Sequence, residues 1–539
     1  MARSGWDGGS RTARWLQVLG VFVAALWIRL ATVGNFVTTD EGTWLLRSVN
    51  FSDALLDGEF SEASASTGEL ATMPGGPTMW LGSLGRLVWA IGQTVGLVES
   101  DRAFETMAGL HVAQAMVALA TSLLIALTVA LVHRWAGWGA AAVAAVLLVG
   151  EPWVGALGSI LHTDELTALF GMAGLLLLAV TFDVPDRCRW SRPMVGAAAG
   201  GFVLALAPLT KATGLVFGVG AALIIGFALW RDVKRRGGGD PNELASLRYK
   251  QLAAAAAGAL VAVPLAWPAL LADPSTQVSA FLDSVGIANE TSQEDFQGDL
   301  GAGGWWFYAV ALPFRVTPWF LLAVVVGGPL ALIQRATRAR AVWLVLWLAP
   351  GAITIAAATK QFDRYGLIVV VPLAVLAGVG LGRTLDRLLA TRPPMRAVFG
   401  VSAAAVVAYA VWFAPWGLLY FNPALGGASR AEDVLLVGWG EGTERAIDLI
   451  REQEGGDCNG VTVAGTRESV FGRTLSSPLA LLGETCASPP RRGSLPTYVV
   501  AYINQTQRMT DAQLDAVLAG REQVGTVEIR GITVATVWR

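Results

Sequence analysis

Long apolar runs separated by short polar loops dominate the first 420 residues of the chain. A run of about 17–25 apolar residues is long enough to cross a bilayer as a helix. The pattern therefore predicts an α-helical polytopic membrane protein with about eleven transmembrane helices. The expected spans are 14–34, 107–132, 138–157, 164–182, 194–210, 212–230, 251–272, 313–334, 341–358, 366–382 and 397–419. The first run is long and lacks a small-residue cleavage site after it, so we expect a retained helix and not a signal peptide.

One further run, 79–97, is apolar but contains Arg86, Gln93 and several glycines. The distribution of basic residues resolves its placement. If 79–97 does not cross, the N-terminal arginines and all later basic clusters fall on one side, as the positive-inside rule requires. These clusters lie at 134, 187–192, 231–250, 335–340 and 383–396. We therefore expect a plasma-membrane protein with a cytoplasmic N-terminus and a long first outer loop, 35–105, that contains juxtamembrane helices.

The chain after residue 420 has a different pattern. Shorter apolar stretches alternate with polar ones at the spacing of strands and short helices. We expect strands at 433–437, 498–503 and, as a pair, 526–538, with helices at 442–453 and 511–519. Residues 1–420 are thus predicted to form the transmembrane catalytic domain, and 421–539 a small extracytoplasmic α/β domain.

Cys458 and Cys486 both fall in this outer domain, whereas the third cysteine, Cys188, lies in an inner loop. An extracytoplasmic location permits a disulfide between Cys458 and Cys486. Two reduced thiols remain the alternative at this stage.

Composition supports the membrane assignment. Of the 539 residues, 54% are hydrophobic and only 15% are charged, whereas a soluble domain has about 25% charged residues. The net charge of −2 argues against a nucleic-acid partner. Many of the 21 tryptophans lie near predicted membrane boundaries, where this side chain is common.

Polar residues on the outer side concentrate in four segments. They are Thr38-Thr39-Asp40-Glu41, Ser159 to Glu165, Leu209-Thr210-Lys211 and Lys360 to Tyr365. Although they are far apart in the sequence, all four are predicted at the same depth and on the same face. Ionisable groups are costly at a membrane, so their common location predicts a functional site.

The residue types in these segments suggest a reaction. Asp40, Glu41 and Asp164 are candidate catalytic acids, since a carboxylate can act as a general base or orient a hydroxyl. Lys211, Lys360 and Arg364 can hold a phosphate, with His162 and Tyr365 as further binding candidates. A phosphate with an apolar tail at a membrane surface is a polyprenyl phosphate. The combination predicts glycosyl transfer, in which the phosphate leaves and an acceptor hydroxyl attacks. The sequence leaves open whether a divalent cation assists the acidic motifs.

Each segment also has a simpler interpretation. Asp40 and Glu41 could cap a helix that begins at Gly42, and Asp164 with Glu165 could complement a helix dipole. The lysines and Arg364 could be interface anchors whose charged ends reach the water.

The four segments together resemble the GT-C glycosyltransferases that use a lipid-phosphate sugar donor. The likeness is to bacterial dolichyl-phosphate-mannose-protein mannosyltransferase-like proteins and to the lipid A aminoarabinose transferases. It rests on the four segments, on Tyr420-Phe421-Asn422-Pro423 with Leu425-Gly426-Gly427, and on Gly438-Trp439-Gly440-Glu441-Gly442. It spans nearly the whole chain.

The resemblance implies that Asp40 is the catalytic base, that Asp164 and His162 help to bind donor or acceptor, and that Lys211, Lys360 and Arg364 contact the carrier phosphate. It also implies inversion at the sugar in one displacement, for which many similar enzymes need no metal. The chain departs from the pattern in the first loop, where the expected His-Pro-Gly-Val-like stretch is replaced by Met73 to Met79.

The predicted partners are a polyprenyl-phosphate-linked sugar, membrane lipid and an acceptor that could be a protein, a lipid or a glycan. The transferred sugar could be mannose or another hexose or pentose. Two alternatives remain: a polysaccharide polymerase or ligase with a lipid-linked donor, and a lipid or sugar transporter. A transporter would more often place ionisable residues at mid-membrane, whereas here they lie at the outer rim.

Overall fold

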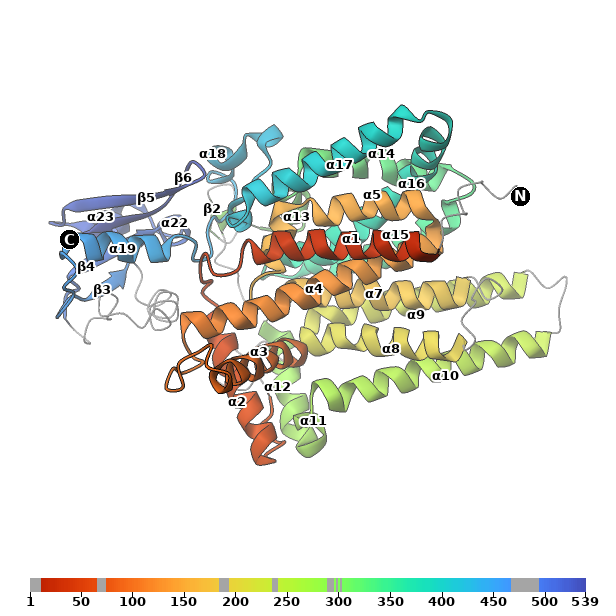
Figure 1. The fold of residues 1–539 in the computed structure, drawn as a ribbon, viewed down its shortest axis with the longest axis horizontal. Helices are drawn as coiled ribbons and strands as arrows, with labels where there is room; N and C mark the ends of the chain where they lie inside the picture. The colour runs from red at the N-terminus through yellow and green to blue at the C-terminus, as the bar shows by residue number, and fades with distance from the viewer. Residues whose placement is uncertain are drawn as a thin grey trace.

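The computed structural model describes residues 11–64, 74–183, 193–234, 241–287, 295–296, 299–300, 303–466 and 494–539. Long helices run side by side to form a bundle, and a small sheet domain lies beyond one end of it (Figure 1). The first helix, α1, begins at the opposite end of the bundle. The architecture confirms the predicted fold class, an α-helical membrane protein with a small C-terminal α/β part.

Eight of the described helices are long and apolar enough to cross a membrane: Met107–Ala136, Asp164–Phe182, Pro193–Thr210, Ala212–Trp230, Ala245–Ala266, Arg338–Ala357, Asp363–Thr391 and Pro394–Phe413. Two shorter apolar helices, Trp138–Val149 and Pro318–Ile333, accompany them. With α1, Arg11–Leu30, they correspond to the eleven predicted spans.

The helices of the bundle are bounded as follows: α1 Arg11–Leu30, α4 Met107–Ala136, α5 Trp138–Val149, α6 Pro152–Leu157, α7 Asp164–Asp183, α8 Pro193–Thr210, α9 Leu215–Lys234, α10 Pro241–Ala266, α13 Phe307–Arg315, α14 Pro318–Ile333, α15 Arg338–Ala357, α16 Leu367–Thr391 and α17 Pro394–Phe413. The helix α7 is central, because 94% of its apolar stretch is buried inside the bundle. The helix α17 is peripheral, with only 6% of its apolar stretch buried. This difference means that α7 can hold its polar N-terminal residues in a fixed position.

Three predicted spans are interrupted, and each break has a local cause. The run 138–157 divides into α5 and α6 before Pro152, and 313–334 divides into α13 and α14 before Pro318. The run 251–272 divides into α10 and α11, Ala269–Ala272, at Pro268. Proline has no N–H for the helical ladder and is tolerated at a helix start, so these helices restart where the apolar pattern alone predicts continuity.

Four helices gather at the end of the bundle that faces the sheet domain: α2 Glu41–Asp57, α3 Gly76–Thr94, α11, and α12 Pro274–Ile287 (Figure 1). The helix α3 contains most of the run 79–97, which the distribution of basic residues predicts not to cross. It is not one of the eight spanning candidates among the described residues. Two short strands, β1 Asp295–Phe296 and β2 Asp299–Leu300, pair with each other.

The C-terminal sheet has the strand order β3-β4-β6-β5. Its strands are β3 Val463–Gly465, β4 Tyr498–Tyr502, β5 Gln523–Ile529 and β6 Ile532–Trp538, and its helices are α18 Gly427–Ala431, α19 Thr443–Gln453, α22 Ile503–Thr506 and α23 Asp511–Leu518. Strands β3 and β4 are parallel, and the other pairs are antiparallel. The strand expected at 433–437 is wrong: the chain turns there after α18. β3 is an additional strand.

The β5–β6 turn and the Gly-rich turn both contact the membrane part of the chain. Strands β5 and β6 are connected by Arg530 and Gly531, both with positive φ, the conformation of a tight hairpin turn. Arg530 donates to the carbonyl of Trp412 at the end of α17, and its guanidinium lies 4.2 Å from the Trp412 ring centroid. In the Gly-rich turn, Trp439 accepts a hydrogen bond from Thr39 N–H. The sheet domain therefore contacts the loop that contains Asp40.

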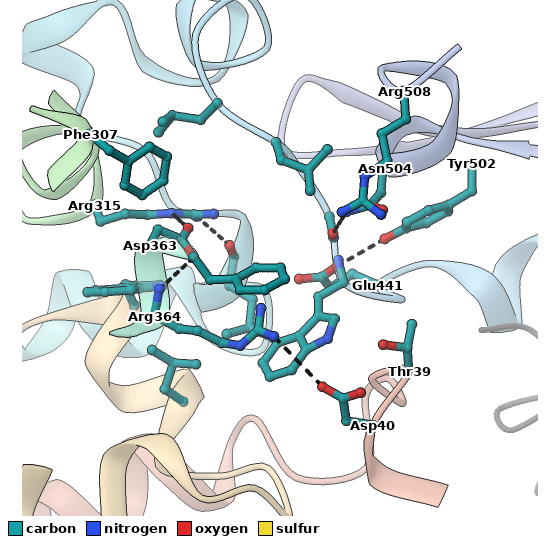
Figure 2. A pocket seen from close by; sticks show the side chains of 18 residues that line it. Thr39, Asp40, Phe307, Arg315, Asp363, Arg364, Glu441, Tyr502, Asn504 and Arg508 are labelled. Atoms are coloured by element: carbon teal, nitrogen blue, oxygen red, sulfur yellow. Dashed lines mark hydrogen bonds and ion pairs between the residues drawn. The ribbon is translucent and has the colours of Figure 1, made fainter. Parts of the chain in front are cut away.

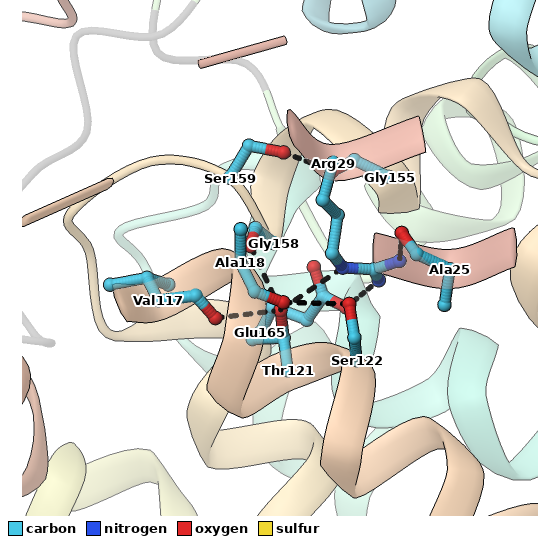
Figure 3. A network of polar contacts seen from close by, with 10 residues as sticks. All are labelled: Ala25, Arg29, Val117, Ala118, Thr121, Ser122, Gly155, Gly158, Ser159 and Glu165. Carbon is cyan, nitrogen blue, oxygen red and sulfur yellow. Dashed lines mark hydrogen bonds and ion pairs between the residues drawn. The ribbon is translucent and has the colours of Figure 1, made fainter. Parts of the chain in front are cut away.

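A buried ion pair holds three helices of the bundle together. Arg29 of α1 lies 2.5 Å from Glu165 of α7, and both side chains are almost fully buried. Arg29 also donates to Thr121 of α4, which in turn donates to the carbonyl of Gly158 (Figure 3). The network fixes the start of α7, where Asp164 precedes Glu165.

Candidate active site

The loop between α1 and α2 presents Asp40 to the candidate site. Asp40 is the N-cap residue of α2 but makes no side-chain cap hydrogen bond, so helix capping does not account for its carboxylate. That side chain is 44% exposed and lines the cavity described below. Its neighbour Glu41 is fully buried. The Glu41 carboxylate accepts hydrogen bonds from Thr38 N–H, Gln114 Nε2 and Leu161 N–H.

Glu41 therefore connects three segments: its own loop, α4 through Gln114, and the loop before α7 through Leu161. It does not line the cavity. This geometry fits a residue that positions Asp40 and His162 better than one that contacts a substrate.

His162 and Asp164 lie close to Asp40. His162 belongs to the loop before α7, and Asp164 is the first residue of α7. His162 Nε2 lies 3.5 Å from Asp40 Oδ2, and its Nδ1 lies 3.2 Å from Asp164 Oδ2. Lys211 donates to Asp164 Oδ1 at 2.5 Å. The carboxylate of Asp164 is thus surrounded by positive groups, whereas Asp40 keeps an open side toward the cavity.

Arg364 joins both carboxylates. Its Nε lies 3.2 Å from Asp164 Oδ2, and its Nη2 lies 3.9 Å from Asp40 Oδ2. It is in the 3-10 turn Asp363–Gly366 between α15 and α16. Side chains from all four polar segments therefore meet at one place, which we call the ionic centre: Asp40, His162, Asp164, Lys211 and Arg364.

Tyr365 and Lys360 lie at the edge of the ionic centre. The ammonium of Lys211 lies 3.9 Å from the centroid of the Tyr365 ring. Lys360 is half-buried and has no ion pair with any residue in the described ranges. Lys211 also pairs as an isolated bridge with Pro74. The Pro74-Gly75 step of the divergent first-loop motif therefore lies beside Lys211, and Met73 lies outside the described residues.

Arg47 of α2 was not identified from the sequence. Its side chain is almost fully buried, and its Nε has no hydrogen-bond partner among the residues that the structure describes. The guanidinium lies 4.8 Å from the Trp44 ring centroid, and Trp44 packs edge-on against His162. Burial lowers the pKa of Arg47 to about 10, although the charge of Asp40 opposes this. A buried cation without an ion-pair partner among the described residues is costly, and the sequence of the first loop does not distinguish Arg47 from the other polar residues there.

The charges at the ionic centre shift one another. Desolvation alone would raise the pKa of Asp40, but the hydrogen bond and charge of His162 and the charge of Arg364 lower it below its usual value. Desolvation lowers the pKa of His162, but Asp164 and Asp40 reverse that effect and raise it overall. For Lys211, desolvation dominates and lowers the pKa. Asp40 is therefore ionised at neutral pH.

The ionic centre does not suit a divalent cation. Each carboxylate faces positive groups, Lys211 and Arg364 on Asp164 and Arg364 on Asp40, and these would repel a metal ion. Within the described ranges, no group of three or more His, Cys, Asp or Glu side chains could hold one. The side chains of the ionic centre therefore do not fit the divalent cation that the sequence allowed.

A cavity of about 190 Å³ opens beside Asp40, between the ends of the membrane helices and the sheet domain (Figure 2). Arg315 and Asp363, which form an ion pair at 2.5 Å, line its membrane side. Glu441, Tyr502 and other residues of the sheet domain line the opposite side. We call it the interdomain cavity.

Trp439 connects the interdomain cavity to the ionic centre. Its ring centroid lies 4.9 Å from that of His162, edge to face, and the guanidinium of Arg364 lies 4.2 Å from it. Gly440, the next residue, has φ +125°, and an added Cβ would come within 2.3 Å of the carbonyl of Val37. The Gly-rich stretch is therefore a close-packed turn against the Asp40 loop.

Cys458 is disulfide-bonded. Cys486 lies outside the described residues, so the pairing of these two cysteines stays a prediction.

No protein-family model and no curated protein matches the sequence. Solved structures do match. ArnT from Cupriavidus metallidurans, an aminoarabinose transferase, bound to undecaprenyl phosphate, aligns over 98% of this chain and 98% of its own, with a TM-score of 0.55 and 15% identity. Its apo state aligns over the same fractions, with a TM-score of 0.53 and 13% identity.

At these identities the likeness shows the fold alone. The alignment covers both the membrane helices and the C-terminal part, as the resemblance seen in the sequence implied. This chain is a multi-pass membrane protein with the GT-C fold of the glycosyltransferases to which ArnT belongs.

Proposed function

We propose that the protein is an inverting glycosyltransferase that moves a sugar from a polyprenyl-monophosphate carrier to an acceptor hydroxyl on the outer face of the membrane. The observation that carries the proposal is the position of Asp40. Its carboxylate is ionised, half-exposed at the wall of a cavity, and adjacent to a cluster of cations. The fold shared with ArnT, which was solved with undecaprenyl phosphate, supports a carrier of that class.

In the proposed reaction, Asp40 accepts the proton of the acceptor hydroxyl as its oxygen forms a bond to the anomeric carbon of the sugar. The bond between that carbon and the phosphate oxygen breaks, and the polyprenyl phosphate leaves with the electron pair. A single displacement of this kind inverts the anomeric configuration. Asp164, held by Lys211 and Arg364, organises the cations and does not act as a second base.

The cationic residues provide the carrier-phosphate site. Neither Lys360 nor the buried Arg47 has an ion-pair partner among the described residues, although the charge of Asp40 acts on Arg47. Lys211 and Arg364 add positive charge, and Tyr365 packs against Lys211. The donor's phosphodiester has one negative charge, the departing polyprenyl phosphate gains a second, and charge-assisted hydrogen bonds from these cations to phosphate are strong. Its departure as an anion would be favoured by the same groups.

We also propose that the sheet domain and the ionic centre face the outside and that the N-terminus is cytoplasmic. The basic clusters in the inner loops support this orientation. A cysteine placed at Ser61, which is exposed beyond α2, should react with an impermeant thiol reagent in intact cells. A cysteine at the exposed Thr391, at the end of α16, should react only after permeabilisation. The parent chain gives the background, and the reverse labelling pattern would invert the topology.

The direct test of function is incubation of the purified protein with radiolabelled polyprenyl-monophosphate sugars. Release of the free carrier phosphate together with transfer of the label would support the proposal. The matched polyprenyl-diphosphate sugars test the polymerase or ligase alternative. If only the diphosphates are consumed, or if none is, the monophosphate reaction is excluded.

Loss of the His162 charge is expected to shift the pH dependence of transfer. The imidazolium lowers the pKa of Asp40, so His162→Asn should raise it. Less Asp40 is then ionised at a given acidic pH, and the acid limb of kcat/KM should move up by about one pH unit, the smaller end of the effect of a nearby opposite charge. The control is His133→Asn. His133 is in the last turn of α4, and the ionic centre does not include it. If the acid limb does not move, either His162 does not lower the pKa of Asp40 or Asp40 is not the group whose ionisation sets that limb.

A further inference from the structure

A buried acceptor atom at the interdomain cavity has no donor among the described residues. Glu441 is fully buried. Its Oε2 accepts from Trp439 N–H at 2.6 Å and from Tyr502 O–H at 3.0 Å. Its Oε1 has no hydrogen-bond partner among the described residues. An unsatisfied buried carboxylate oxygen is costly, so a ligand donor in the cavity would be favourable at this point.

The charges that line the interdomain cavity balance one another. Three acids, Asp40, Asp363 and Glu441, are matched by three arginines. Arg315 pairs with Asp363, and Arg364 lies beside Asp40. The lining therefore has no surplus of positive charge for a phosphate or carboxylate ligand, and Glu441 Oε1 would repel one. A neutral ligand with hydroxyl groups fits this charge pattern.

The shape and composition of the cavity favour a ligand with several hydroxyls. A volume of about 190 Å³ is far larger than the roughly 10–15 Å³ that one water needs. Asn504 and Thr39 add polar groups to the wall, and aromatic rings such as Trp153 and Phe307 add flat apolar surfaces. Small-molecule sites commonly combine such apolar walls with a few placed polar groups. A serine or threonine side chain would supply one hydroxyl only, whereas a sugar ring supplies several.

We propose that the interdomain cavity is the acceptor site and that the acceptor is an uncharged carbohydrate, one of whose hydroxyls donates to Glu441 Oε1 while another faces Asp40. This inference rests on the proposed glycosyl transfer and names the acceptor class for the same site. It also gives the sheet domain a role in acceptor recognition, since Glu441, Tyr502 and Asn504 all belong to it.

Glu441→Gln tests the contact with little change in shape. The glutamine oxygen can keep the hydrogen bonds from Trp439 and Tyr502, which places its NH2 group where Oε1 was. The site then offers a donor in place of an acceptor. We expect the KM for methyl α-mannopyranoside or methyl α-arabinofuranoside to rise about 10- to 100-fold, the effect of losing a hydrogen bond to a charged group. Donor hydrolysis to water, measured without acceptor, reports separately whether the donor site still works in this variant.

The matched control is Glu528→Gln on the exposed face of β5, which should leave both measurements unchanged. Thermal unfolding in detergent checks that Glu441→Gln is folded. Should it not be, Thr39→Val, which removes a cavity hydroxyl at constant shape, is expected to raise the same KM. An unchanged KM in a folded Glu441→Gln, or in Thr39→Val if that variant is needed, overturns the proposal.

The acceptor panel separates the remaining outcomes. Transfer to neutral methyl glycosides but not to the matched methyl glucuronide supports the inference. Transfer only to a serine- and threonine-containing peptide, or preference for the glucuronide, overturns it and leaves the transferase function standing. If wild-type protein consumes no polyprenyl-monophosphate sugar even by hydrolysis, the proposed function itself fails.

Discussion

Replacement of Asp40 by asparagine is expected to reduce sugar transfer by about 10³-fold or more. A positioned general base contributes about 10²–10⁴-fold to a rate, and asparagine cannot accept the proton of the acceptor hydroxyl. The substitution keeps the size of the side chain, which makes no cap hydrogen bond in α2, so folding should be little affected. The measurement is transfer of label from a polyprenyl-monophosphate sugar to the acceptor that the panel identifies.

Two further measurements make the Asp40 result specific. Undecaprenyl phosphate should still raise the unfolding temperature of Asp40→Asn, because the proposed phosphate site lies on the cations and a ligand stabilises the state that it binds. Asp57→Asn, at the exposed end of the same helix, should retain normal transfer. If Asp40→Asn transfers sugar at the wild-type rate, Asp40 is not the base and the mechanism must be assigned to another group.

The membrane half of the site was predictable because each of its residues interrupts an apolar run. Asp40, Asp164 and Lys211 are charged residues at helix ends, and the arrangement of basic loops placed these ends on one face. The shared depth was enough to predict that these residues lie near one another. The division of roles between them did require the structure, since only coordinates show Asp164 enclosed by cations and Asp40 open to a cavity.

The half of the site that the sheet domain contributes was not predictable in the same way. Trp439 and Glu441 are about 400 residues from Asp40, and no periodicity relates them to it. Their placement depends on tertiary contacts, among them Thr39 N–H to Trp439 O and Val37 N–H to the Glu444 carboxylate. The surface against which the Gly-rich turn packs is set by the docking of the whole domain.

Loss of Arg29 is expected to be the most destabilising substitution in the bundle that leaves the candidate site chemically intact. Arg29→Met leaves Glu165 buried among α1, α4 and α7 without its ion-pair partner (Figure 3). Breaking a buried pair by removing one partner costs about 3–5 kcal/mol, and the low polarity of the surroundings gives no water to compensate. Denaturation in mixed micelles should show a loss of stability of this size. Arg387→Met, at an exposed position of α16, should show none.

The double variant Arg29→Met with Glu165→Leu distinguishes an uncompensated charge from lost packing. Removing both charges should recover most of the stability, because apolar replacement of a buried ion pair is often neutral or favourable. If the double variant is as unstable as the single one, the lost stability comes from lost packing of the two side chains and not from an uncompensated charge. Asp164 immediately precedes Glu165 at the start of α7. Recovery of stability without recovery of transfer would therefore show that the ion pair also positions Asp164. The pair would then connect the bundle core to the ionic centre.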